Sequence, residues 1–154
     1  MALPPGSLLD LDWAGSEILG IDDCWRLVDT QAVGRIGLVD AGSPVILPVN
    51  IARDGSRIVF RTGPGSKLAA AMLQRPVCVE VDHWDPMQHT GWSVVAKGVA
   101  DHVLDPDELD RLDRLPVRPW SNPDRRPEWV RVMVTELTGR RLRHGELGHP
   151  TAEG

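Results

Sequence analysis

The sequence predicts a mostly β protein with short helices, built as a six-stranded antiparallel barrel. Two observations carry this prediction: apolar and polar residues alternate in six runs, and most links between the runs are short and rich in turn-forming residues. The Asp54-Gly55 pair between two such runs is typical of a β-hairpin. Only three segments favour a helix, too few for the crossovers of a parallel sheet. A chain of 154 residues can bury one ordinary core. We therefore expect one domain over residues 21–143, with an arm at 1–20 and a flexible tail at 144–154.

The first half of the chain combines one helix with three strands. Asp22 can cap a helix over residues 23–31. A strand is expected at 33–39, and the run 44–52 has apolar residues at all its odd positions, which puts them on one face of a strand. A strand at 56–62 follows the Asp-Gly turn, so these last two strands should be antiparallel neighbours.

The second half continues the same pattern. Helix formers at 68–74 follow a glycine-rich turn. Valines alternate with polar residues over 77–82, and extended runs follow at 91–103 and 129–142. Each of these three runs is predicted to be a strand.

The third helix is expected at 106–114. Asp105 and Glu108 have the spacing of a capping box, and Pro106 suits the first helical position. Its acidic residues are most simply a solvated face rather than a cation site. They are Asp105, Asp107, Glu108, Asp110 and Asp113.

Charge and motifs exclude several classes of protein. A formal net charge of −5 disfavours nucleic-acid binding. The first residues lack a basic leader, and no apolar run is long enough to span a bilayer, so we expect a cytoplasmic protein with no membrane partner. Cys24 and Cys78 are not in a CxxC motif, so we expect neither a disulfide framework nor a structural zinc site. A hydrolase is disfavoured because no GxSxG motif is present.

The segment FRTGPGSKL at residues 60–68 is the most informative for chemistry. It combines backbone N–H groups at a helix start, the hydroxyl of Ser66 and the charges of Arg61 and Lys67, which together suit a monophosphate. The segment does not match a Walker A loop. The alternative from spacing alone is a hairpin end and a helix cap in which Arg61 and Lys67 are only solvated.

The order of segments resembles the FMN-binding split-barrel family of pyridoxamine 5'-phosphate oxidase-like proteins, in particular its small bacterial branch. The resemblance runs from about Cys24 to Arg141. It rests on CWRLVDTQAVGRIGLV, PVILPVN, IVFRTGPGSKL, VCVEVD, TGWSVVAKGVA and RPWSNPDRRPEWVRVMVTELTGRRL. It implies a split β-barrel of the FMN-binding type.

The resemblance also implies a homodimer that holds FMN at the subunit interface, with the phosphate against one chain and part of the ring near the other. The β-strand segment would lie against the ring, the glycine-rich segment would hold the ring and the phosphate, and later segments would complete the site. The implied residues of the β-strand segment are Leu47, Pro48, Val49 and Asn50. Those of the glycine-rich segment are Arg61, Thr62, Ser66 and Lys67, and those of the later segments are Trp92, Ser93, Trp120, Trp129 and Arg131.

The chain also departs from the oxidase itself. It lacks the full set of Arg and Lys residues, and the C-terminal segment, with which the oxidase grips pyridoxamine phosphate. We therefore expect a flavin-dependent oxidoreductase that acts on another small organic substrate. Two alternatives stay open: a deazaflavin-dependent reductase, and a non-catalytic protein that binds flavin or haem.

Overall fold

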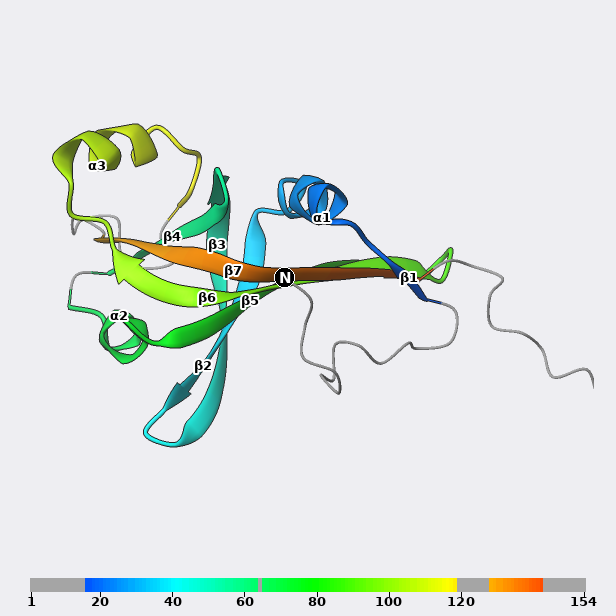
Figure 1. Cartoon of the computed structure of the whole chain (residues 1–154), viewed down its shortest axis with the longest axis horizontal. Coiled ribbons are helices and arrows are strands. Elements are labelled where there is room, and N and C mark those ends of the chain that lie inside the picture. Colours follow the sequence, from blue (N-terminus) through cyan, green and yellow to red (C-terminus); the bar gives the residue numbers. More distant parts are fainter. Residues whose placement is uncertain (1–15, 64, 119–127, 143–154) are drawn as a thin grey trace, which may run out of the picture.

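A computed structural model describes residues 16–63, 65–118 and 128–142 (Figure 1). Most of the expected arm, the tail at 144–154 and Trp120 lie outside these residues. The described strands are β1 Ser16–Ile18, β2 Val33–Asp40, β3 Ser43–Asp54, β4 Arg57–Thr62, β5 Pro76–Asp85, β6 Thr90–His102 and β7 Glu128–Leu142. The helices are α1 Ile21–Val28, α2 Lys67–Met72 and α3 Pro106–Leu112.

The strands form one antiparallel sheet that closes on itself. Their order is β1-β7-β4-β3-β2-β5-β6, and β7 also pairs with β6. The prediction of a mostly β antiparallel barrel with short helices is confirmed. The structure adds a seventh strand, because β1 pairs with the end of β7 in the register Ser16↔Leu142.

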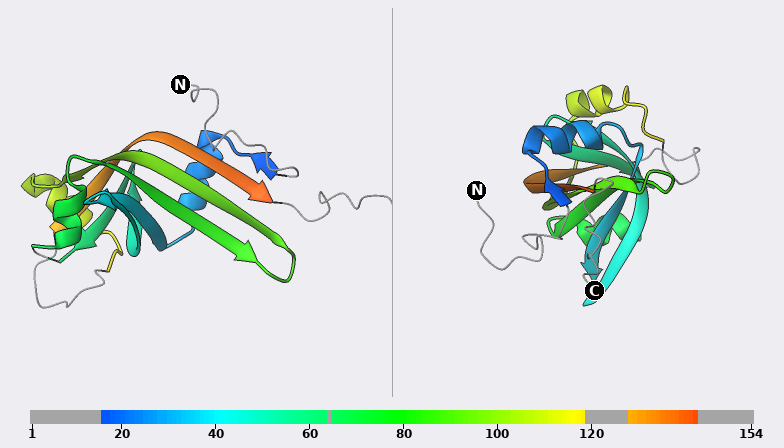
Figure 2. Two further views of the ribbon diagram at one scale, coloured as in Figure 1. Left: turned by 90° about the horizontal axis from the view of Figure 1, so that it is seen from below. Right: turned by 90° about the vertical axis from the view of Figure 1, so that its right-hand side faces the viewer.

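The longest strand, β7, closes the barrel. Its first six residues, Glu128 to Met133, pair with β4, and most of its length pairs with β6. The β6–β7 register shifts between Lys97 and Gly98, where a bulge bends the strand. Figures 1 and 2 show α2 and α3 at the same end of these long strands, on opposite sides of the sheet. The β5–β6 hairpin projects toward the other end (Figure 2).

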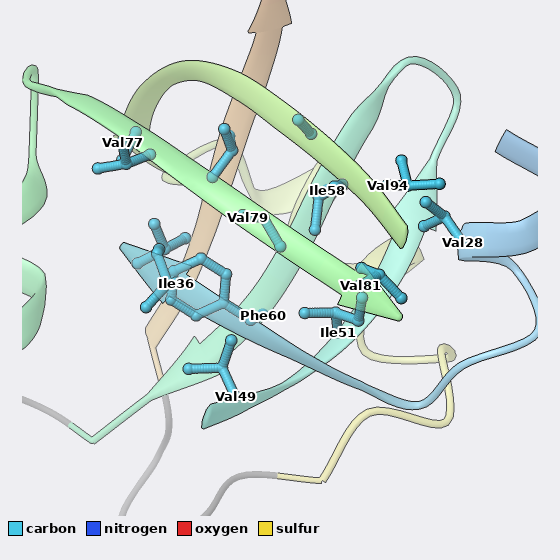
Figure 3. Close-up of a cluster of buried hydrophobic side chains, with 14 of the residues drawn as sticks. Val28, Ile36, Val49, Ile51, Ile58, Phe60, Val77, Val79, Val81 and Val94 are labelled. Atoms are coloured by element: carbon cyan, nitrogen blue, oxygen red, sulfur yellow. The ribbon is translucent and has the colours of Figure 1, made fainter. Parts of the chain in front are cut away.

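The main core lies inside the barrel. Inward residues of the strands meet there, as the labelled side chains in Figure 3 show, and α1 and α2 contribute Cys24, Val28, Ala69 and Met72. The expectation that Cys24 is a core residue is confirmed, because it is fully buried. A second, smaller apolar cluster lies against α3 and contains Val59, Val103, Leu112, Val117 and Trp129.

The two expected side-chain caps are wrong. Gly20 precedes α1, so Asp22 lies in the first turn of the helix instead of capping it. Asp105 occupies the N-cap position of α3, but its side chain makes no capping hydrogen bond. In both helices the acidic residues still lie near the positive end of the helix dipole. None of the helices in the described ranges is both long and apolar enough to cross a membrane.

Candidate functional site

An open edge of β3 is the first element of the candidate site. β3 pairs with β2 from Ser43 to Asn50, but its pairing with β4 begins only at Ile51. Over residues 43–50, therefore, β3 has a partner strand on one side only within the described chain. Unpaired backbone N–H and C=O groups need hydrogen-bond partners. This edge can supply them to a planar ligand, and it contains four of the sequence-predicted site residues, Leu47, Pro48, Val49 and Asn50.

The side chains of these four residues divide between the two faces of the strand. Val49 is buried in the core, and Leu47 is on the same face but 37% exposed. Pro48 is exposed on the outer face. Asn50 also lies on that face, and its Nδ2 donates to the carbonyl oxygen of Arg118 at 2.6 Å. The amide of Asn50 thus fastens the segment after α3 to β3.

The glycine-rich turn after β4 is the second element. Thr62 ends β4 and is only 6% exposed, yet its Oγ1 has no hydrogen-bond partner in the described part of the chain. Ser66 caps α2, since its Oγ accepts from the N–H of Ala69 at 3.4 Å, and its own proton stays available for donation. Lys67 begins α2 and is exposed. A buried hydroxyl without a partner costs free energy unless a ligand completes it, so this turn fits an anionic group.

Arg61 does not share that location. Arg61 and Thr62 are neighbours on a strand and point to opposite faces of β4. The guanidinium of Arg61 lies 4.4 Å above the ring of Trp129, and its Nη2 donates to Oδ1 of Asp113 at 2.9 Å. The indole Nε1 of Trp129 donates to the same oxygen at 2.7 Å. We call Arg61, Asp113 and Trp129 the Asp113 cluster.

The Asp113 cluster lines a cavity of about 810 Å³ between α3 and the ends of β4, β6 and β7. Arg131 lies on the same side of the sheet, where its Nη1 donates to both carboxylate oxygens of Glu108 at 3.0 Å. Three of the sequence-predicted residues, Arg61, Trp129 and Arg131, are therefore brought together, and all three bind α3. The expectation that the acidic residues of α3 form a solvated face is wrong for Glu108 and Asp113, which hold the helix on the sheet.

Trp92 and Ser93 lie far from the Asp113 cluster. They are near the start of β6, whereas His102, at its end, pairs with Val130 beside Trp129. At about 3.3 Å per residue this separation is about 30 Å along the strand. Trp92 packs partly against the main core and, with Arg141, lines a small cavity of about 180 Å³. A single chain therefore does not bring all the sequence-predicted residues to one place.

Sequence reasoning did not identify a cluster of charged side chains on the outer face of the sheet. Nη1 of Arg35 on β2 donates to Glu80 at 3.1 Å and to Asp82 at 3.0 Å, both on β5. Burial, followed by repulsion from Asp82, raises the pKa of the Glu80 carboxyl, although Arg35 opposes this. The signal in the sequence was the acidic residues at the polar positions of the strand expected at 77–82. Their partner could not be found without the strand order.

A family model described as pyridoxamine 5'-phosphate oxidase matches residues 21–141 of the chain. The chain belongs to this family. Among its relatives, the uncharacterized protein Rv0080 of Mycobacterium tuberculosis is 33% identical over 127 residues, which are 78% of this chain and 83% of that protein.

Two solved structures have the same architecture as this chain. The FAD-binding protein of Mycobacterium smegmatis is 36% identical, with a TM-score of 0.71 over 82% of this chain and 97% of that one. A conserved protein of unknown function from Corynebacterium diphtheriae is 32% identical, with a TM-score of 0.71 over 83% and 98% of the two chains. The split-barrel fold expected for this family member is confirmed.

Proposed function

We propose that this chain binds a flavin nucleotide and acts as a flavin-dependent oxidoreductase on a small organic substrate. The observation that carries the proposal is the buried, unpartnered hydroxyl of Thr62, close in sequence to Ser66 and Lys67. The name of the M. smegmatis relative, a FAD-binding protein at 36% identity, supports the same ligand class.

The residues present fit the chemistry of a flavin nucleotide. Thr62 and Ser66 would donate hydroxyl protons to phosphate oxygens, and Lys67 would supply the charge. The open edge of β3 would offer backbone groups to the polar edge of the ring, against Pro48. A bound flavin supplies hydride transfer, so the protein has only to bind, orient and tune the ring.

The nucleotide we propose from the sequence is FMN, whereas the name of the relative indicates FAD. Both carry the ring and the phosphate that would meet Lys67. A deazaflavin coenzyme is the alternative with the same phosphate chemistry. The titration below therefore includes all three.

We also propose that the functional unit is a homodimer. The strand order supports it, because β2 and β5 lie between the β3 edge and Ser93 on β6, and a second copy would bring its own Trp92 and Ser93 to the first chain's edge. The outer face also exposes apolar side chains, including Ile46 at 71% and Val39 at 58%. A mainly apolar hollow of about 670 Å³ lies beside them. A cytoplasmic location is supported by the free thiols of Cys24 and Cys78.

The test is a visible spectrum of the purified protein followed by calorimetric titration with FMN, FAD and a deazaflavin. Lys67→Ala should weaken flavin binding about tenfold or more, since hydrogen bonds to a charged group contribute roughly 1.5–3 kcal/mol. Arg26→Ala is the control, because Arg26 is exposed and pairs with Asp23 within α1. Unchanged affinity in Lys67→Ala would remove Lys67 from the site, and failure of wild type to bind any of the three would end the proposal.

Turnover separates the enzyme from a binding module. Reduction of the bound flavin by NADH or NADPH, and its reoxidation by an organic acceptor, would support the oxidoreductase. Tight binding without reduction by either donor would leave a flavin-binding protein only. Light scattering of the loaded protein would decide whether it is a dimer.

A further inference from the structure

The outer face of the sheet carries a cation on β2, the strand that pairs with β3 on the side away from its open edge. Residues directly opposite in an antiparallel pair point to the same side. Pro48 of β3 is opposite Arg35 of β2, and Arg35 is opposite Glu80 of β5. The side chain of Arg35 is therefore the next one along the face from Pro48, about one strand spacing, roughly 4.8 Å, away.

The next pair of opposite residues on this face, on β5 and β6, includes Ser93, a second sequence-predicted site residue. Asp82 is opposite Ser93 of β6, so Ser93 also points to the outer face. Pro48 and Ser93 thus lie on either side of Arg35, Glu80 and Asp82. We call these three residues the Arg35 cluster.

Arg35 is held in place but keeps free donors. Both of its hydrogen bonds use Nη1, which meets Oε2 of Glu80 and Oδ1 of Asp82. Its Nε and Nη2 make no hydrogen bond to any of the described residues, and its side chain is 53% exposed. Two anchored carboxylates fix the direction of a long side chain in advance, which lowers the entropy that a ligand would have to overcome. Nε and Nη2 then form a ready fork of parallel N–H donors.

The charge of the Arg35 cluster limits what this fork can bind. One guanidinium and two carboxylates give a net charge of −1, so the Arg35 cluster does not attract anions over a distance and the fork acts through direct hydrogen bonds. A planar edge with two neighbouring acceptors fits these two parallel donors. N1 and O2 of an oxidised flavin ring are such an edge.

Arg61 was the cation first expected near the ring, but its guanidinium is committed to Asp113 and Trp129 beside α3. Lys97, another cation of the outer face, pairs with Glu136 at 3.4 Å and lies toward the opposite edge of that face. We propose that Arg35 is the residue that donates to N1 and O2 of the flavin ring, an inference that rests on the flavin binding proposed above. In this arrangement Glu80 and Asp82 are positioning residues that act through Arg35.

This contact makes binding depend on the redox state of the ring. Reduction by two electrons and one proton leaves a negative charge shared by N1 and O2, so both hydrogen bonds become charge-assisted. In the proposed arrangement the donor hydrogens would contact those atoms directly, whereas the two carboxylates bind Nη1 and are 31% and 47% exposed, so that water screens them. Arg35 therefore stabilises the reduced ring more than the oxidised ring.

The experiment uses the full chain loaded with FMN or FAD, whichever wild type binds more tightly. Arg35→Gln and Arg35→Lys are compared with Arg26→Gln, which removes an exposed guanidinium from an ion pair on α1. For each variant we would measure the Kd of the oxidised flavin, the reduction potential in a dithionite titration against reference dyes, and the unfolding midpoint. Lysine keeps the charge but cannot form the fork, so it should not rescue either property.

The expected result is about tenfold weaker binding of oxidised flavin in both Arg35 variants. The loss for reduced flavin should be about tenfold larger still, which lowers the potential by about 30 mV for a two-electron couple. Arg26→Gln should match wild type. If Arg35→Gln fails to fold, the Kd and the reduction potential of Arg35→Lys alone test the inference.

Two results would overturn the inference while leaving the proposed function intact. One is wild-type Kd and potential in a folded Arg35 variant. The other is weaker binding without a change in potential, because that would place Arg35 away from the redox-active edge. Absence of flavin binding by wild type itself would instead defeat the proposed function, and this inference with it.

Discussion

The indole Nε1 of Trp129 donates a hydrogen bond to Oδ1 of Asp113 at 2.7 Å, which ties the closing strand β7 to the end of α3. Trp129 is only 2% exposed, so its indole is almost wholly buried. The same carboxylate oxygen accepts from Arg61, whose side chain is 16% exposed. One surface carboxylate therefore satisfies two largely buried donors.

Asp113→Ala should destabilise the protein by about 2 kcal/mol, because a buried donor left without a partner costs roughly 1–3 kcal/mol. Asp113→Asn keeps an acceptor oxygen for the indole and should lose about half as much. Urea unfolding followed by tryptophan fluorescence measures both. Asp110→Ala, an exposed position on the same helix, is the control and should stay within about 0.5 kcal/mol of wild type. Equal stability of Asp113→Ala and Asp110→Ala would mean that the Asp113 cluster does not hold α3.

The bulge in β7, opposite Lys97 and Gly98 of β6, leads to a second prediction. A Cβ at Gly98 would lie 2.0 Å from the carbonyl oxygen of Met133, a backbone atom of the neighbouring strand. Gly98→Ala therefore forces β6 and β7 apart and should cost roughly 1–3 kcal/mol of unfolding free energy. Gly20→Ala serves as the control, since nothing lies within 4 Å of its Cβ position. Wild-type stability in Gly98→Ala would show that the strand closure tolerates a side chain there.

Local patterns identified most of the elements before any contact was known. The run expected at 44–52 lies within β3, and the Asp54-Gly55 turn joins it to β4 as predicted. Alternation and turn chemistry act over a few residues, so the sequence displays them directly. The helix expected at 106–114 was found at Pro106–Leu112 for the same reason.

Long-range partners were the part that local patterns could not provide. Glu108 and Asp113 read as solvated residues because nothing near them in sequence pairs with them. Their partners, Arg131 and Arg61, are on other strands. Arg35 shows the same limit, since its carboxylates become neighbours only once β2 lies beside β5. The separation of Ser93 from the β3 edge likewise depends on strand order alone.

Stability should depend on pH through Glu80. Its carboxyl has a raised pKa, so between about pH 4.3, the ordinary pKa of Glu, and that raised pKa the folded chain binds more protons than the unfolded chain. The stabilisation from Glu80 is complete below this window and is lost as the pH rises through it. Glu80→Gln should remove this slope from a series of urea unfolding experiments. A slope unchanged by the substitution would contradict the assignment to Glu80.

The contribution of Asp54 to stability should depend on pH in the opposite direction, which the same urea unfolding series would measure. Hydrogen bonding to Arg111 lowers the pKa of the Asp54 carboxyl. Its stabilisation is therefore present above about pH 3.9, the ordinary pKa of Asp, and is lost as the pH falls through the lowered value. Asp54→Asn should be less stable than wild type at neutral pH and should lose less stability on acidification. Equal acid sensitivity of the two proteins would exclude this role for the pair.

Thr62 should separate stability from ligand binding. Its buried hydroxyl has no partner in the described chain, so Thr62→Val replaces an unpaired polar group with a methyl of similar size. Without flavin, Thr62→Val should be as stable as wild type or up to about 1 kcal/mol more stable. With flavin, its affinity should fall about tenfold, or about 1.4 kcal/mol, because the phosphate loses a donor.

Thr62→Ser is the matched variant with the reverse pattern. It keeps the hydroxyl but loses one buried methyl, so it should lose about 1 kcal/mol of stability while its flavin affinity stays within about threefold of wild type. Urea unfolding of the flavin-free protein and calorimetric titration with flavin measure the two properties on the same samples. A loss of stability in flavin-free Thr62→Val would mean that the hydroxyl has an internal partner, and wild-type flavin affinity in that variant would remove Thr62 from the binding site. Only opposite effects in the two variants support a hydroxyl that is buried for a ligand and not for the fold.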